Sequence, residues 1–417
     1  MKNRTLTYID LFAGAGGLSE GFFRQGFSPI AHVEMDSNAC KTLQTRTAYH
    51  YLKRTGIIDK YVEYLNGFLS RNSLYELLPP ELHQSVLNFE ISKDNINDIF
   101  SKIDRLMFLN DSQKVNIIIG GPPCQAYSFV GRSKIGKNVL KDKRNYLFKL
   151  YGKFLERYNP DIFVFENVPG LYTAGKGKYY RGLKYYFKNL GYILEDKILN
   201  SSDFGVLQER KRVILIGWKK TLIFSYPNFN SNKSPYTVND LFFDLPKLKA
   251  GECIPVQPLI SDRNVDCLKD IKIYSDLNIL TGHIARTHNN NDLQIYKMAI
   301  DKWNNGRERL KYCDLPEELK THGNQKSFND RFKVVNGDGY SHTVVAHIAK
   351  DGHYYIHPDI NQFRSISVRE AARIQSFPDD YYFESSRSSA FQQIGNAVPP
   401  LMAEKIAQNI MEKFYER

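Results

Sequence analysis

The stretch TYIDLFAGAGGLSEGFFRQG, residues 7–26, contains the first structural unit of the chain. Its first six residues form a short, mainly apolar run that is typical of a buried strand. The glycine-rich AGAGG indicates a tight turn, and LSEGFFRQG then follows as a helix signal. A strand that runs through a glycine-rich turn into a helix predicts the start of an α/β fold.

The same alternation of strand and helix signals continues through the first half of the chain. Further strand signals lie at SPIAHVEM (28–35), VNIIIGG (115–121), DIFVFENV (161–168) and RVILIGW (212–218). Strands that alternate with helices predict a mostly parallel, Rossmann-like sheet covered by helices on both faces. Such sheets bind ligands at the carboxyl ends of their strands, so functional residues are expected there.

Composition and charge restrict the class of protein. The chain has 417 residues, 42% of them hydrophobic, which favours a packed core over disorder. A net charge of +12 favours an acidic partner such as nucleic acid, although an ordinary basic enzyme fits the same number. The five cysteines include no CxxC pair, which argues against a disulfide framework. Without a signal peptide or a long apolar stretch, the protein is expected to be soluble and cytoplasmic, with no membrane contact.

The texture of the sequence divides the chain into three parts. The strand and helix rhythm covers 1–222, apart from a polar, helical-looking insertion at about 46–90. The alternation of strand and helix signals does not continue over 223–360. This segment is rich in Arg, Lys, His, Asn and Tyr, and it predicts a second, smaller domain. The last part, 361–417, carries two helix signals, the first opened by a capping box, SVRE at 367–370. We expect this last part to return to the first domain.

The end of the second strand signal indicates a nucleoside cofactor. Glu34 in VEMD stands where an acidic residue at the end of strand two holds a ribose diol. The glycine-rich turn after strand one allows such a ligand to approach closely, although a plain tight connection fits the turn equally. There is no GxxxxGK[ST] phosphate loop, which disfavours ATP. A cofactor without phosphates, such as S-adenosylmethionine, fits these features.

Reactive side chains accompany three other strand signals. Cys124 leaves a strand on the stiff corner GGPPC, and Glu166 follows an apolar run in FENV, where a partly desolvated carboxyl can act as an acid. Arg210 and Arg212 in QERKR precede another strand, and their spacing predicts one shared face. Taken alone, the cysteine is compatible with an unreactive loop residue, and the two arginines are compatible with a basic rim on an edge strand. Together they suit nucleophilic addition to an electron-poor ring such as cytosine, followed by group transfer.

In this order, the motifs resemble those of the DNA (cytosine-5)-methyltransferases of bacterial restriction-modification systems. The resemblance runs from residue 8 to about 410 and rests on DLFAGAGGLSEGF, VEMD, GGPPCQAYSF, FENVPGL, QERKR, SVREAARIQSFPDDY and QIGNAVPP. It implies methyl transfer from S-adenosylmethionine to C5 of a cytosine rotated out of a DNA duplex. It also implies that 1–222 catalyses the reaction and binds the cofactor, and that 223–360 recognises the DNA target.

The resemblance implies roles for the residues around the reacting cytosine. Cys124 is the expected nucleophile on C6, and Pro123 shapes its loop and lies against the cofactor. Glu166 is expected to hydrogen-bond to N3 and to help protonate it, with Asn167 supporting the carboxyl. Arg212 is expected to contact the flipped base.

Other residues are implied to bind DNA. Arg210 is expected beside the same cytosine, and Gln125 and Ser128 in a loop that closes over the duplex. The implied partners are a short palindrome of double-stranded DNA and, functionally, a restriction endonuclease. The protein is expected to act as a monomer, and these residues do not define its target sequence.

The implied cofactor site draws on both ends of the chain. Its expected residues are Phe12, Gly14, Gly16, Glu34, Met35, Asn396 and Val398. The family commonly places an Asp in a GDI-like element against the adenine amino group. Here KDNINDI at 93–99 puts Asn95 at that position, where its side-chain carbonyl can accept the same hydrogen bond, with Asp94 and Asp98 as alternatives.

Two other functions are compatible with parts of this pattern. A catalytically silent DNA-binding regulator would need none of Cys124, Glu166 and Arg212, and all three are present. A transfer-RNA cytosine-5 methyltransferase would typically carry a Cys-Phe-Thr element in its recognition domain, and the chain has none. The histidines of the recognition segment have no paired cysteines or HExxH element beside them, so we expect no metal site.

Overall fold

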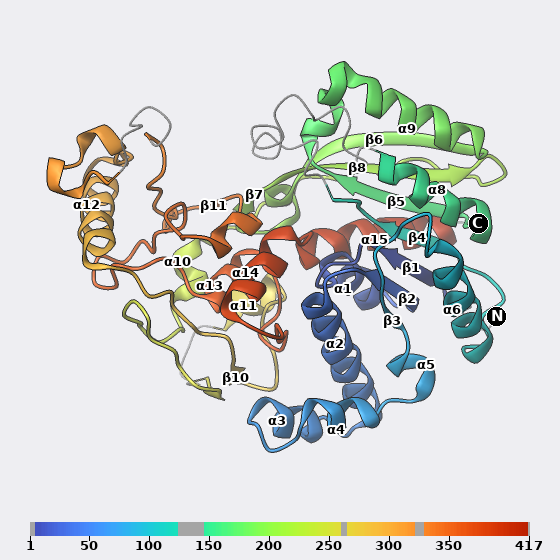
Figure 1. Cartoon of the computed structure of the whole chain (residues 1–417), viewed down its shortest axis with the longest axis horizontal. Coiled ribbons are helices and arrows are strands. Elements are labelled where there is room, and N and C mark those ends of the chain that lie inside the picture. Colours follow the sequence, from blue (N-terminus) through green and yellow to red (C-terminus); the bar gives the residue numbers. More distant parts are fainter. Residues whose placement is uncertain (1–4, 124–145, 260–264, 322–328, 416–417) are drawn as a thin grey trace.

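A computed structural model of the chain describes residues 5–123, 146–259, 265–321 and 329–415. A seven-stranded sheet in the order β3-β2-β1-β4-β5-β8-β6 forms its centre (Figure 1). Its strands are β1 (Thr7–Leu11), β2 (Ser28–Glu34), β3 (Val86–Asn88), β4 (Ile117–Gly120), β5 (Ile162–Asn167), β6 (Tyr192–Asn200) and β8 (Lys211–Lys219). All five predicted strands are present in this sheet.

The sheet is mostly parallel, as predicted. Strands β3, β2, β1, β4 and β5 run in one direction, and only β8 pairs antiparallel, with β5 on one side and β6 on the other. Chain order reverses between β1 and β4, because β2 and β3 lie on one side of β1 and β5 lies beyond β4. In open α/β sheets a ligand crevice forms at such a switch point, outside the carboxyl ends of the strands.

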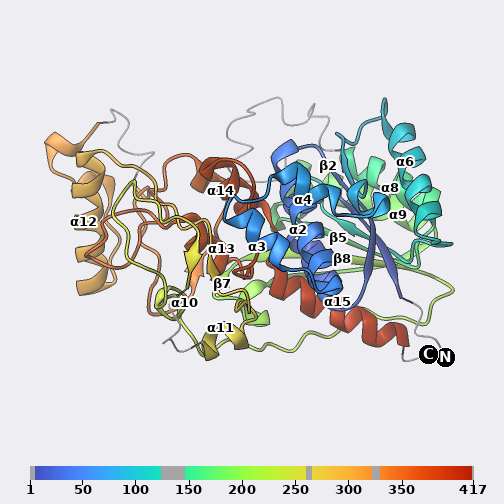
Figure 2. The same cartoon turned by 90° about the horizontal axis from the view of Figure 1, so that it is seen from below.

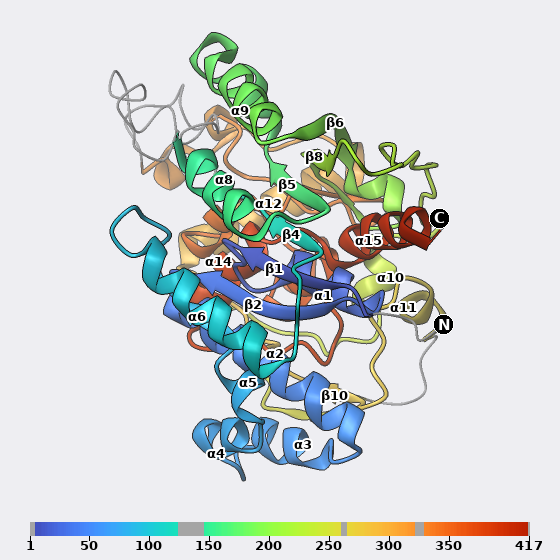
Figure 3. The ribbon, with the colours of Figure 1, turned by 90° about the vertical axis from the view of Figure 1, so that its right-hand side faces the viewer.

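Helices cover both faces of the sheet (Figure 3). One face carries α6 (Ile96–Leu109), α8 (Leu147–Tyr158) and α9 (Lys178–Asn189), and the other carries α1 (Gly17–Arg24) and α15 (Pro400–Tyr415). The apolar run of β4 serves both faces, since Ile117 and Ile119 pack toward α1 and α15 while Ile118 packs toward α8. This explains why the strand reads as a continuous apolar run.

A group of four helices extends from the end of β2. They are α2 (Ser37–Thr55), α3 (Asp59–Leu65), α4 (Arg71–Glu76) and α5 (Pro80–His83). The Asp36 side chain accepts a hydrogen bond from Asn38 N at the start of α2, and Gly56 with φ of 78° ends the helix. Tyr49, Leu52, Tyr61 and Leu74 form a small core of their own.

The segment 223–360 contains short elements and one long helix. These are α10 (Val238–Phe242), β9 (Gln257–Pro258), α11 (Asp266–Asp270), β10 (Ile279–Leu280), α12 (Asn290–Gly306) and β11 (Ser341–His342). Both Figure 1 and Figure 2 place α12 at the end of the molecule farthest from the sheet, where it packs in a separate apolar cluster. Val238 and Leu241 of α10, in contrast, share one core with α1 and α15.

The C-terminal part joins these regions. It consists of α13 (Val368–Ile374), α14 (Arg387–Asn396) and α15. The capping box is present, because Ser367 and Glu370 each bond the other residue's main chain. Helix α15 lies so close to α1 that a side chain at Gly21 would collide with the backbone of Ala403 and Glu404. The C-terminal part therefore packs directly on the first helix of the sheet domain. Within the described ranges, no helix is long and apolar enough to cross a membrane.

Candidate active site

The carboxyl ends of β1, β4 and β5 meet because two glycines follow one another there. A side chain at Gly120, whose φ is 136°, would collide with the carbonyl oxygen of Leu11 on β1. A side chain at Gly121 would collide with the carbonyl and the carboxylate of Glu166 on β5. The two glycines thus let the chain leave β4 between its neighbours and bring the next loop against Glu166.

Asn167 holds the start of that loop. Its Nδ2 donates a hydrogen bond of 3.2 Å to the carbonyl oxygen of Pro122, and its Oδ1 accepts one of 2.9 Å from Val168 N. Asn167 is buried, whereas Pro123 is exposed at the corner. The contacts of Asn167 are therefore with the Pro-Pro corner. Cys124, Gln125 and Ser128 lie outside the described residues.

Glu166 and Arg212 form an ion pair at this edge. Arg212 Nε lies 2.8 Å from Glu166 Oε1, and the two side chains are only 11% and 16% exposed. A second guanidinium nitrogen of Arg212 donates to the carbonyl oxygen of Lys211 at 2.8 Å. The antiparallel pairing of β5 with β8 places the two residues together, since Asn167 opposes Val213. One carboxyl and one guanidinium from separate strands thus face the same partly open site.

Arg210 differs from the sequence expectation. It precedes β8 and is 1% exposed, and its guanidinium donates to the carbonyl oxygens of Val344, Gly395 and Ala397 at 2.6 to 3.0 Å. The spacing of two does not place it beside Arg212, because the chain at 208–209 forms β7 and pairs with β11 (Ser341–His342) before β8 begins. Arg210 therefore joins the sheet domain to the later segments, and its place beside the cytosine stays a prediction.

The glycine-rich turn has open space at Gly14 and is hydrogen-bonded to Glu34. Phe12, Gly14 and Gly16 all have positive φ, at 57°, 55° and 80°. Gly14 N donates a 2.8 Å hydrogen bond to Glu34 Oε2, and Asp36 N donates one of 2.8 Å to Glu34 Oε1. No described atom lies within 4 Å of a side chain built at Gly14. The turn thus presents bare backbone beside an acidic residue, as a close-fitting nucleoside site requires.

Burial and charge shift the acids at this edge. Burial raises the pKa of the Glu34 carboxyl, and backbone hydrogen bonds from Asp36, Gly14 and Met35 partly offset that rise. Asp10 of β1 is 1% exposed, and its pKa is raised well above the ordinary value by burial and by the charge of Glu34. Within the described part of the chain, neither Asp10 oxygen has a hydrogen-bond partner. Met35, beside Glu34, is 62% exposed and available to cover a ligand.

One of the two C-terminal residues of the predicted site, Val398, lies beside the start of α1. Val398 is buried, and its carbonyl oxygen lies so close to Gly17 that a side chain at Gly17 would collide with it. Asn396 ends α14 and is exposed. Two segments almost 400 residues apart in sequence are thus adjacent at the start of α1.

Asn95 bonds to a residue just before it in the chain, and its contact with the adenine stays a prediction. It precedes α6, and its Oδ1 accepts hydrogen bonds of 3.1 Å from Ser92 N and 2.9 Å from Ser92 Oγ. The oxygen that was expected to accept the adenine amino group is already occupied by these two donors. Asp94 and Asp98 are both exposed on either side.

Tyr381 is a contact that sequence reasoning missed. Its hydroxyl donates a hydrogen bond to the carbonyl oxygen of Ala15, inside the glycine-rich turn. The only signal in the sequence is its place at the end of the motif SVREAARIQSFPDDY, which does not reveal a partner. Among the described residues, no group of three or more His, Cys, Asp or Glu side chains is arranged to hold a metal.

Comparison with known proteins identifies the family. The sequence model of the C-5 cytosine-specific DNA methylase family matches residues 6–61 and 83–412, which leaves out part of the group from α3 to α5. The chain belongs to this family and is a DNA cytosine methyltransferase of restriction-modification type.

Individual relatives are similar over almost the whole chain. The type II methyltransferase M.Bpa9945I of Bacillus paralicheniformis is 44% identical, over 97% of this chain and 98% of its own length. The type II methyltransferase M1.HphI of Haemophilus parahaemolyticus is 33% identical, over 98% of this chain and 87% of its own length.

Solved structures agree in fold. A prophage-encoded E. coli protein, assigned as a DNA modification methyltransferase, superposes with a TM-score of 0.63 at 24% identity, covering 98% of this chain and 99% of that one. The methyltransferase EhMeth of Entamoeba histolytica gives a TM-score of 0.55 at 14% identity, covering 99% of both chains.

Proposed function

We propose that the chain transfers a methyl group from S-adenosylmethionine to C5 of a cytosine within a short, specific sequence of double-stranded DNA. The ion pair of Glu166 and Arg212, beside the Pro-Pro corner that leads to Cys124, carries this proposal. The corner supplies a stiff support for a nucleophile, and the pair supplies a carboxyl and a cation that can face a base. Membership of the cytosine DNA methylase family supports the choice of substrate.

The chemistry assigns one step to each group. The thiolate of Cys124 forms a bond to C6 of the cytosine, and Glu166 hydrogen-bonds to N3 and gives it a proton, so electron density moves to C5. C5 then takes the methyl group, which releases S-adenosylhomocysteine. Loss of the C5 proton and cleavage of the S–C6 bond return the thiolate, and the N3 proton goes back to Glu166 to leave the 5-methylated base. Arg212 holds the Glu166 carboxyl and contacts the base. Because C6 is inaccessible within a stacked duplex, the base must first rotate out.

The residues at the ends of β1 and β2 fit an adenosine cofactor with a positively charged sulfur. When bound, S-adenosylmethionine supplies an electrophilic methyl group. Phe12 and Gly14 would contact it with backbone, Glu34 would hold its ribose, and Val398 would close the pocket.

Loss of the Glu34 carboxylate is expected to weaken cofactor binding selectively. In Glu34→Ala the ribose acceptor and the brace on Gly14 N disappear together, so the Kd for S-adenosylmethionine should rise more than about tenfold. The Kd for DNA should change less than about twofold. Calorimetry measures both, with Glu412→Ala as control, since Glu412 is an exposed acid near the end of α15. Unchanged cofactor binding in Glu34→Ala would remove Glu34 from the site.

Target recognition is proposed to reside in 223–360. The segment contains its own apolar cluster around α12, remote from the sheet, and many side chains that can read base edges or bind phosphates. Replacing it by the corresponding segment of a relative with a different target should give an active chimera that methylates the relative's sequence. Val238 and Leu241 should be retained, because they pack in the core shared with α15.

A second chimera provides the control for this exchange. Replacing residues 62–82 by the corresponding segment of the relative should leave the methylated DNA sequence unchanged, because these residues lie outside the family match. Methylation mapped by bisulfite sequencing distinguishes the two results. An active 223–360 chimera that keeps the original target would place recognition elsewhere.

One experiment tests the function as a whole. The protein is incubated with labelled S-adenosylmethionine and unmethylated genomic DNA, and 5-methylcytosine is mapped by bisulfite sequencing. Methylation at one short motif supports the proposal and identifies the target. DNA binding without incorporation would favour a silent regulator, and incorporation into RNA alone would favour an RNA substrate. We further propose that the protein acts as a cytoplasmic monomer and that its methylation protects DNA from a partner endonuclease.

A further inference from the structure

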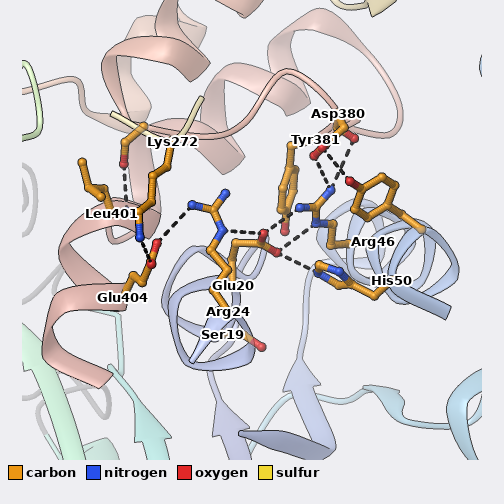
Figure 4. A network of polar contacts seen from close by, with 12 residues as sticks. Ser19, Glu20, Arg24, Arg46, His50, Lys272, Asp380, Tyr381, Leu401 and Glu404 are labelled. Carbon is orange, nitrogen blue, oxygen red and sulfur yellow. Dashed lines mark hydrogen bonds and ion pairs between the residues drawn. The ribbon is translucent and has the colours of Figure 1, made fainter. Parts of the chain in front are cut away.

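A buried arginine joins the first two helices to the C-terminal part (Figure 4). Arg46 of α2 donates through Nε and Nη2 to both carboxylate oxygens of Glu20 on α1, at 2.9 and 2.6 Å. Its Nη1 donates to Asp380 Oδ1 at 2.7 Å. All three side chains are less than 10% exposed. Breaking the buried ion pairs between one cation and two carboxylates costs free energy, because removing one partner leaves an uncompensated buried charge.

This arrangement fixes the position of Tyr381, the residue after Asp380. The Arg46 guanidinium lies over the Tyr381 ring at 4.7 Å from its centroid. Arg369 of α13 donates to the main-chain oxygen of Tyr381 at 3.0 Å, and Tyr381 N donates to Pro378 O at 2.9 Å. The side chain is 1% exposed, and burial raises the pKa of its hydroxyl, so the hydroxyl stays protonated and can donate.

The hydroxyl is aimed at the glycine-rich turn. It donates to the carbonyl oxygen of Ala15, and a side chain built at Gly16 would lie 3.0 Å from the Tyr381 oxygen. Inside the turn, Gly16 N donates a 2.9 Å hydrogen bond to the carbonyl oxygen of Ala13, and three residues from 12 to 16 have positive φ. A turn of this kind is strained for ordinary residues and depends on its surroundings to hold one conformation.

We propose that Tyr381 is a positioning residue for the cofactor: it fixes the conformation of the turn at 12–16 that receives S-adenosylmethionine. The inference rests on the proposed function of that turn. Arg46 acts through Tyr381 by holding its ring, so the effect reaches the cofactor site through the turn at 12–16. The C-terminal part thus determines cofactor affinity through the turn, in addition to lending Val398 to the pocket.

The chain offers a matched pair of variants for the test. Tyr381→Phe removes the hydroxyl and keeps the ring. Tyr49→Phe removes a buried hydroxyl of the same network, which donates to Asp380 Oδ2 at 2.6 Å. The Arg46 guanidinium also lies over the Tyr49 ring, 4.1 Å from its centroid. Both variants lose hydrogen bonds of a buried hydroxyl, since Tyr49 also accepts one from Lys53 Nζ at 3.1 Å, but only Tyr381 bonds to the turn. A purely structural role would therefore affect the two variants alike.

Calorimetry with S-adenosylhomocysteine, the demethylated product, measures binding without turnover. Tyr381→Phe is expected to raise its Kd about five- to tenfold and Tyr49→Phe less than twofold, with DNA affinity unchanged in both. At saturating cofactor, kcat of Tyr381→Phe should stay near that of the wild type while KM for the cofactor rises. Amide hydrogen exchange at residues 13–20, measured without cofactor, should accelerate in Tyr381→Phe alone.

The outcomes separate this inference from the proposed function. Wild-type affinity and exchange in Tyr381→Phe, or equal changes in both variants, would overturn the positioning role. All measurements are made at a temperature at which circular dichroism shows the three proteins folded, so global unfolding does not enter. A wild type that binds no cofactor would instead contradict the proposed function, and the exchange experiment would still report whether Tyr381 fixes the turn.

Discussion

Replacing Cys124 by alanine is expected to reduce methyl transfer more than about 10³-fold while DNA binding remains measurable. Without the sulfur no bond to C6 forms, and C5 of cytosine is too weak a nucleophile to take the methyl group unaided. Removing a nucleophile typically costs several orders of magnitude in rate, and the binding contacts are unaffected. Transfer of labelled methyl groups to DNA measures the loss, and fluorescence anisotropy with a labelled duplex measures binding.

Cysteines outside the site provide the controls for this experiment. Cys253 and Cys313 are exposed free thiols, so Cys253→Ala and Cys313→Ala should retain wild-type transfer. A thiol reagent should inactivate the wild type and both control variants, and bound DNA should slow the inactivation. Full residual transfer in Cys124→Ala would refute covalent catalysis by this residue.

Replacing Glu166 by glutamine is expected to lower the rate of methyl transfer about 10²- to 10⁴-fold. The amide keeps the shape of the side chain and an oxygen that can accept from Arg212, so the fold should persist. It cannot give a proton to N3, so negative charge on the ring is not relieved and C5 is less activated. Single-turnover transfer at saturating DNA and cofactor measures this step.

The matched control for Glu166 lies in the same sheet. Glu195 of β6 has a side chain that is 48% exposed and pairs with Lys197 at 3.8 Å, so Glu195→Gln should transfer at the wild-type rate. Thermal unfolding of both variants checks that the fold is intact. Near-wild-type single-turnover transfer in Glu166→Gln would assign protonation of N3 to another group.

Several features of this protein were predicted from local sequence alone. Strands β1, β2, β4 and β5 are marked by short apolar runs, because strands buried on both faces need apolar residues at every position. The capping box at Ser367 is a contact within one turn of helix and can be read from four letters. The ordered motifs also indicated the family, whose membership the comparisons confirm.

Strand direction and short strands were not predictable in this way. The apolar run of β8 resembles the runs of the parallel strands. Its antiparallel direction depends on pairing with β6, and the sequence of β6, YILEDKILN, contains no pattern that predicts this pairing. Strand β3 has only three residues and exists because β2 offers an unpaired edge. Such pairing depends on neighbours that are distant along the chain.

The sequence by itself determined the strand, turn and helix unit at the start, the apolar core strands and the reactive residue types at their ends. The tertiary structure alone decided which of these residues meet. It paired Glu166 with Arg212 and turned Arg210 toward the carbonyl oxygens of Val344, Gly395 and Ala397. It also brought Tyr381 onto Ala15, 366 residues earlier. Local patterns reflect burial and backbone geometry over a few residues, whereas a hydrogen bond between distant segments depends on how the whole chain packs.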